Sequence, residues 1–95
     1  MAPTIEDIKQ KILPVLKIHH VKRAGLFGSV ARGDSSQDSD VDILVEIEDN
    51  LSLLDVVGIK LELEETLGRR VDLVEYNAIK PLLRERILGE EVAIL

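Results

Sequence analysis

The hydrophobic positions along the chain first follow the period of a helix. Apolar residues recur every three or four positions over 5–16 and again over 53–67, so we expect helices there. Thr4 and Ser52 precede these segments, and each has an aspartate three residues later, which is typical of an N-terminal helix cap. Pro14 lies inside the first segment and predicts a kink or an early end. The positions that define the two apolar stripes are Ile5, Ile8, Ile12, Leu13 and Leu16, then Leu53, Val56, Ile59, Leu63 and Leu67.

Other segments have the period of strands. We expect strands over 21–27, 40–47 and 70–75, with a short helical turn over 30–32 that ends at Gly33 and a polar loop over 34–39. The middle strand alternates cleanly, which predicts one buried and one exposed face. Its expected buried positions are Val41, Ile43, Val45 and Ile47, and its expected exposed positions are Asp40, Asp42, Leu44 and Glu46.

The last third of the chain predicts one more helix. Asn77 is the expected cap of a helix over 79–88, and Pro81 falls in its first turn, where proline is tolerated. Gly68 is a natural end for the helix over 53–67. The final EEVAIL fits either a short strand or an ordered tail. Helices and strands in this order predict a single domain over 1–95, an α/β (α+β) fold with helices packed on a small mixed sheet.

Length and composition narrow the class of protein. The 95 residues are 45% hydrophobic and 32% charged, which is typical of one small globular domain. No apolar run reaches the roughly 20 residues of a membrane span, and the charged first residues do not resemble a secretory signal. Cysteine is absent, which excludes disulfides and thiolate chemistry. We therefore expect a soluble protein of a reducing cytoplasm.

Charge argues against nucleic acid as a partner. The net charge is −6, and only two aromatic residues, Phe27 and Tyr76, are available for base stacking. Seven acidic residues and no basic residue lie between positions 34 and 49, which fits either a solvated acidic loop or a cation site. These acidic residues are Asp34, Asp38, Asp40, Asp42, Glu46, Glu48 and Asp49.

Two motifs have the character of a phosphate and metal site. Gly28-Ser29 directly follows an expected strand, where glycine permits close approach of a ligand and backbone N–H groups attract phosphate. The same pair also suits an ordinary strand-to-helix turn. Asp40 and Asp42 share one face of a strand, with Cα atoms roughly 6.6–7 Å apart. Two such carboxylates repel unless a cation lies between them, and their hard oxygens suit Mg²⁺. The alternative is a solvent-exposed strand face.

Asp72 is a candidate third carboxylate. It stands alone in the apolar run VDLV, so it either faces solvent at a strand edge or needs a partner or a cation. If its strand neighbours 40–47, Asp72 joins Asp40 and Asp42 on one face. Three carboxylates can hold two Mg²⁺ ions about 3.5–4 Å apart, the arrangement used for in-line displacement at phosphorus.

Other interpretations of these residues fail on detail. The spacing of Gly28 and Gly33 matches a P-loop, but Asp34 stands where the lysine would be. Residues 38–42 imitate the start of a calcium-binding loop, but an isoleucine stands where the turn glycine would be. The histidine pair at 19–20 lacks further ligands at metal-binding spacing and suits the polar end of the first helix.

The stretch GSVARGDSSQDSDVDILV over 28–45 resembles the signature of the minimal nucleotidyltransferase (MNT) family, small members of the DNA-polymerase-β-like nucleotidyltransferase superfamily. RVDLV over 70–74 resembles the strand that carries the family's third carboxylate. The resemblance runs from about Val21 to the last helix and implies the polymerase-β-like nucleotidyltransferase fold. It also implies that Asp40, Asp42 and Asp72 are catalytic residues that bind two Mg²⁺ ions, with Asp72 helping to deprotonate the attacking hydroxyl.

The resemblance assigns the remaining motif residues to the nucleotide. Gly28 and Ser29 would hold the β- and γ-phosphates of a nucleoside triphosphate. Arg32 would steady either the phosphate charge or the loop itself, and Ser39 would support the loop. The implied reaction is attack on the α-phosphorus, transfer of a nucleoside monophosphate and release of pyrophosphate.

A partner protein is also implied. Larger relatives hold the acceptor in a second domain, so we expect the acceptor of this short chain to be a separate molecule. MNT proteins pair with a small helical HEPN protein (higher-eukaryote-and-prokaryote nucleotide-binding), an RNase toxin that the MNT antitoxin adenylylates with ATP. We therefore expect a hetero-oligomer that contacts neither nucleic acid nor membrane directly. The alternatives are a non-catalytic module that neutralises its partner by binding and, less well supported, a transferase for small molecules such as antibiotics. The first helix and the apolar C-terminal EVAIL could contact the partner, but core is the favoured role for both.

Overall fold

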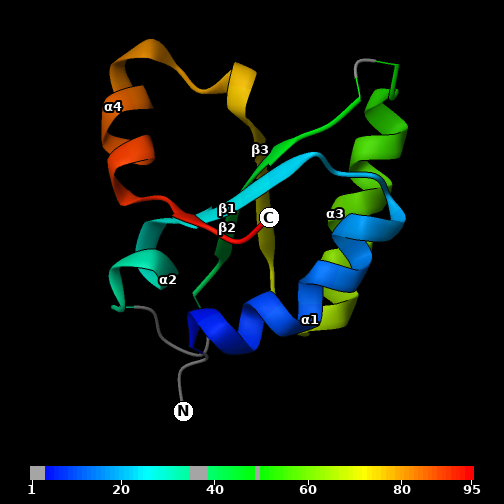
Figure 1. Cartoon of the computed structure of the whole chain (residues 1–95), viewed down its shortest axis with the longest axis horizontal. Helices are drawn as coiled ribbons and strands as arrows, with labels where there is room; N and C mark the ends of the chain where they lie inside the picture. Colours follow the sequence, from blue (N-terminus) through cyan, green and yellow to red (C-terminus); the bar gives the residue numbers. More distant parts are fainter. Residues whose placement is uncertain (1–3, 35–38, 49) are drawn as a thin grey trace.

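A four-stranded mixed sheet, in the order β3-β2-β1-β4, forms the centre of the fold (Figure 1). The computed structural model describes residues 4–34, 39–48 and 50–95. Strand β2 pairs antiparallel with β1 and parallel with β3, and β4 pairs antiparallel with β1. The elements are α1 (Ile5–Ile18), β1 (Arg23–Phe27), α2 (Gly28–Arg32), β2 (Val41–Glu46), α3 (Leu53–Leu67), β3 (Val71–Glu75), the 3-10 turn η1 (Tyr76–Ala78), α4 (Pro81–Glu90) and β4 (Val92–Ala93). These elements confirm the predicted α/β class. Within the final EEVAIL, Glu90 is the last residue of α4, and Val92 and Ala93 form the short strand β4.

The predicted helix caps of α1 and α3 are confirmed. The Thr4 hydroxyl accepts from the N–H of Asp7 at 3.1 Å, and the Ser52 hydroxyl accepts from that of Asp55 at 3.2 Å. Each aspartate accepts in return from the backbone of its cap residue, which completes a capping box.

The prediction that α1 ends early at Pro14 is wrong, because the helix continues to Ile18. The ribbon of α1 does change direction along its length (Figure 1), as expected where proline removes a helical hydrogen bond. Across the described ranges, no helix is sufficiently long and apolar to span a membrane.

Helices cover both faces of the sheet. The larger core lies between the sheet and the pair α1 and α3, and a smaller core lies on the opposite face, beneath α4 (Figure 1). The prediction that β2 has one buried face is therefore only half correct. Val41, Ile43, Val45 and Ile47 are buried as expected, but Leu44 on the other face is also fully buried. The smaller core consists of Phe27, Leu44, Tyr76 and Ile79, packed against Val74, Ile87 and Leu88.

Three further details of the helices differ from or refine the prediction. We expect Leu53 in the buried stripe of α3, but it is the first residue of that helix and is 79% exposed. Asn77 does not cap α4. It lies in η1, and Lys80 occupies the cap position with Pro81 as the first helical residue. His19 ends α1 and contacts Glu62 of α3, so the histidine pair marks the polar end of that helix, as predicted.

A side-chain hydrogen bond between Tyr76 and Glu91 lies next to β4, in addition to the pairing of β4 with β1. Tyr76 is 6% exposed and donates its hydroxyl proton to Glu91, whose side chain is 8% exposed. The Arg23 guanidinium lies 4.3 Å from the centre of the Tyr76 ring and 3.7 Å from a Glu91 oxygen. A Cβ at Gly25 would overlap the Glu91 side chain, so only glycine leaves room for it there. Burial raises the pKa of Tyr76 above its ordinary value, and the bond to Glu91 adds to this, so the phenol remains a donor.

Replacing Tyr76 with phenylalanine is expected to lower the free energy of unfolding by about 1–3 kcal/mol. The ring is retained, but the buried Glu91 carboxylate loses a hydrogen-bond donor. Urea unfolding of the variant measures this loss. In a Glu91→Gln background the same replacement should be much less costly, because the two residues share one interaction. Equal losses in both backgrounds would contradict the assignment.

Candidate active site

Asp42 and Asp72 lie directly opposite each other on adjacent parallel strands. They are register partners between β2 and β3, and neighbouring strands are about 4.8 Å apart. Their flanking residues Val41 and Val71 belong to the core against α1 and α3, so the two aspartates point to the face that α4 covers. Asp40 is exposed, immediately before β2, and lies two residues from Asp42. The predicted pairing of the strand of Asp72 with the strand of Asp42 is therefore confirmed.

The turn from β1 into α2 brings the backbone of Gly28 against the Asp42 carboxylate. Phe27, the last residue of β1, is the register partner of Asp42, so the chain leaves β1 beside that side chain. Gly28 has φ +73°, and a Cβ at this position would overlap an Asp42 oxygen. Glycine is required here both for its left-handed conformation and for this contact. From the sequence we expect Gly28 to let a ligand approach the backbone. In the structure the Asp42 carboxylate makes this close approach.

Ser29 is the second residue of the short helix α2 and directly follows Gly28, which contacts Asp42. The first N–H groups of a helix have no partners within it, and they carry partial positive charge. No side chain caps α2, because its cap position is Phe27. The helix ends at Gly33 with φ +81°, as predicted, and the N–H of Asp34 closes the turn on the Ser29 carbonyl at 3.0 Å. Ser39 is held differently, because its carbonyl accepts from Arg69.

Arg32, the last residue of α2, lies between two carboxylates. Its Nε donates to Asp34 at 3.2 Å, and its Nη1 donates to the two oxygens of Glu90 at 3.2 and 3.3 Å. The Asp34 hydrogen bond raises the pKa of Arg32 above its usual value. Glu90 is the last residue of α4 and also lies 3.6 Å from Nε of Arg86. Sequence analysis missed Glu90, although an acidic residue at a helix C-terminus is unfavourable there and signals a cationic partner.

The electrostatics identify Asp42 as the centre of this group. Its pKa is raised from 3.8 to about 6, first by burial and then by the charges of Asp72 and Asp40, while Arg32 acts in the opposite direction. Three acidic side chains therefore repel one another at one end of the sheet. Asp38 and Asp49, which complete the predicted acidic cluster, lie outside the described residues.

The donor atoms at this position suit Mg²⁺. Carboxylate oxygens are the ligands it prefers, and it commonly uses one or two of them together with substrate phosphates. The overlap that a Cβ at Gly28 would make shows that the backbone also comes within reach of the same carboxylate. As the side chains stand, no three His, Asp or Glu residues in the described ranges are arranged to hold a metal ion among themselves. The assignment of metal ligands therefore stays a prediction.

Comparisons with known proteins agree with the geometry. A family model described as "Polymerase beta, Nucleotidyltransferase" matches residues 10–95. A Methanocaldococcus jannaschii protein, provisionally named a protein adenylyltransferase, is 55% identical over 96% of this chain and 98% of its own length. Protein adenylyltransferase MntA of Thermococcus cleftensis is 43% identical over 78% of this chain and 75% of its own. A crystal structure of a toxin-antitoxin with AMP-PNP contains a chain that superimposes with a TM-score of 0.80 at 25% identity, covering 92% of this chain and 72% of that one.

Proposed function

Since this chain belongs to the polymerase beta nucleotidyltransferase family and is a nucleotidyltransferase, we propose that it transfers AMP from ATP to a hydroxyl group of a partner protein. The observation that carries this proposal is the pairing of Asp42 with Asp72 across β2 and β3, with the Gly28 backbone against Asp42. The names of two relatives, both protein adenylyltransferases, support AMP and a protein acceptor.

In the proposed reaction the acceptor oxygen forms a bond to the α-phosphorus of ATP. The bond from that phosphorus to the bridging oxygen breaks, and pyrophosphate leaves. Asp72 accepts the proton of the attacking hydroxyl, because it is exposed and lies opposite the half-buried Asp42. Two Mg²⁺ ions held by Asp40, Asp42 and Asp72 would neutralise the negative charge that develops on the phosphates.

The phosphate side of the site is assigned to α2. Backbone N–H groups of Gly28 and Ser29 bind the β- and γ-phosphates, since the first turn of a helix presents such donors. Arg32 contributes positive charge at the other end of the same helix. Ser39 supports the chain just before Asp40 through the contact of its carbonyl with Arg69.

The proposed acceptor is a small helical HEPN toxin, with this chain as its antitoxin in a cytoplasmic hetero-oligomer. The toxin-antitoxin structure with AMP-PNP, which superimposes on 92% of this chain, supports both the nucleotide and the partner. Apolar side chains of α3 are exposed along one helical face, which is typical of surfaces that contact proteins. These are Leu54, Val57 and Leu61, spaced three and four residues apart.

Intact-mass measurement of the partner tests the proposed function. The partner is captured from the native host and incubated with this protein, Mg²⁺ and ATP, and we expect it to gain one or more AMP units. Asp72→Asn should remove the gain. Glu75→Gln, a charge-neutralising change at the other end of β3, should leave the gain unchanged.

A tight complex without any AMP gain would contradict catalysis. It would instead support neutralisation by binding alone. Transfer of AMP to a small hydroxyl compound, with the partner left unmodified, would favour the small-molecule transferase.

A further inference from the structure

We propose that Glu90 is a positioning residue, which holds the Arg32 guanidinium in place to bind the triphosphate of the nucleotide. This inference rests on the proposed function. Glu90 ends α4 and Arg32 ends α2, so their ion pair joins two elements that are 58 residues apart in the chain. No sequence motif connects them, and the pair exists only because α4 folds back over the sheet beside α2.

The contacts on Arg32 leave one side of its guanidinium available. Asp34 accepts from Nε and Glu90 accepts from Nη1 with both of its oxygens. Within the part of the chain that the structure describes, Nη2 has no hydrogen bond or ion pair. A guanidinium is planar, so fixing two of its nitrogens also fixes the direction of the third. Its two remaining N–H donors are suited to phosphate oxygens.

Glu90 is well placed to be a fixed anchor. Its side chain is 22% exposed, less than the 41% of Arg32, and Arg86 one turn earlier lies 3.6 Å from one of its oxygens. Helix α4 is itself held by Ile87 and Leu88 in the smaller core. The carboxylate therefore moves with a packed helix, whereas Asp34 belongs to the exposed end of α2.

The position of Arg32 supports the same arrangement. Helix α2 is five residues long, from Gly28 against the Asp42 carboxylate to Arg32 at its end. At 1.5 Å per residue these two ends lie about 6 Å apart along the helix axis, so a triphosphate at the start of α2 and at Asp42 comes within reach of the guanidinium.

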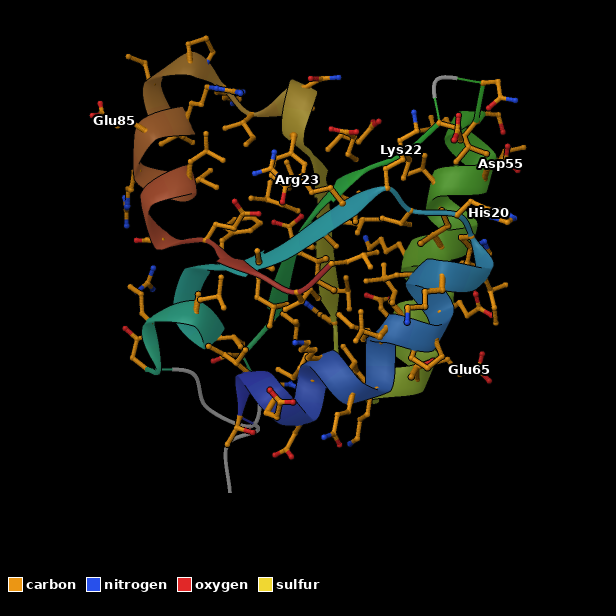
Figure 2. All side chains as sticks on the ribbon, viewed as in Figure 1. His20, Lys22, Arg23, Asp55, Glu65 and Glu85 are labelled. Atoms are coloured by element: carbon orange, nitrogen blue, oxygen red, sulfur yellow. The ribbon has the colours of Figure 1, made fainter. Side chains whose placement is uncertain are left out.

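Shortening the Glu90 side chain tests the proposal without changing the charge of the protein. In Glu90→Asp the carboxylate is withdrawn by one methylene and loses its contact with Arg32. We expect the Kd for Mg²⁺-bound AMP-PNP, measured by calorimetry, and the KM for ATP to rise roughly three- to tenfold, with kcat within about twofold of wild type. Glu85→Asp is the matched control, because Glu85 lies on the same helix and points away from the molecule (Figure 2).

Two further variants separate positioning from charge and from folding. If Glu90 acted only as a negative charge near phosphate, Glu90→Gln would tighten nucleotide binding, whereas loss of positioning weakens it. In an Arg32→Gln background, Glu90→Asp should have no further effect on the Kd, because it acts through Arg32. An unchanged or lower Kd in both Glu90 variants, or full additivity with Arg32→Gln, overturns the proposal. If wild type itself does not bind AMP-PNP, the proposed function fails and not the role of Glu90 alone.

Discussion

Asp42→Asn is expected to reduce AMP transfer roughly a thousandfold or more while the chain stays folded. The residue is the half-buried centre of the three carboxylates, and the change removes the charge that would bind the metal and keeps the shape of the side chain. Initial rates with labelled ATP and the partner measure this effect. Gel filtration of the complex provides the control, because binding of the partner should be retained. Transfer within tenfold of wild type would remove Asp42 from the site.

The same variant is expected to be more stable than wild type near neutral pH. Folding raises the pKa of Asp42 from 3.8 to about 6, mainly by burial, so the folded state binds a proton more readily than the unfolded state. Ionised Asp42 therefore destabilises the fold, and wild type loses this part of its stability as the pH rises from about 4 to 6.

Unfolding by urea at several pH values measures the difference. The advantage of Asp42→Asn should be full above pH 6 and should vanish below about pH 4, where both states of wild type are protonated. Glu85→Gln, an equivalent change at an exposed position, should show no such pH dependence. A variant less stable than wild type at pH 8 would show that the interactions of the charged form outweigh its burial.

Gly28→Ala is expected to reduce activity strongly, and to lower the free energy of unfolding by more than backbone strain alone would. The position has φ +73°, which costs an alanine about 1–2 kcal/mol. The added methyl would also overlap the Asp42 carboxylate, and relieving that overlap costs roughly a further 1–3 kcal/mol. Because the movement displaces Asp42 itself, we expect transfer to fall roughly a hundredfold.

Gly33→Ala is the matched control for this change. Gly33 has φ +81°, similar to Gly28, but a Cβ there would meet no atom of the described residues within 4 Å. It should therefore show the cost of the backbone conformation alone, about 1–2 kcal/mol, and retain most of the activity. Equal losses of stability in the two variants, or normal transfer by Gly28→Ala, would show that the contact with Asp42 is unimportant.

Local features of the fold were predictable because they depend on neighbouring residues. The capping boxes at Thr4 and Ser52, and the end of α3 at Gly68, involve residues within four positions of each other. The Asp40-x-Asp42 spacing likewise predicts two carboxylates on one face without reference to the rest of the chain, although β2 begins only at Val41. The placement of Asp72 needed one further condition, that β3 pairs with β2, and the register of the parallel pair satisfied it.

Features that depend on the packing of distant elements could not be predicted in the same way. Leu44 looked like an exposed position because its neighbours alternate with it, but α4 covers that face of β2 and buries it. Leu53 fits the helical period of α3 but is exposed at the first position of that helix. In both cases the periodicity shows on which face of the helix or strand a residue lies. It does not show whether another element packs on that face.

The sequence by itself therefore determined which residue types the candidate site contains, and the tertiary structure decided their environment. The glycine turn and the carboxylates are encoded in short motifs, because each motif is formed by consecutive residues of one element. The contact of Gly28 with Asp42 and the anchoring of Arg32 by Glu90 arise only when β1 pairs with β2 and α4 packs beside α2. Such contacts depend on register and on helix position, which are set by the whole core and not by any local pattern.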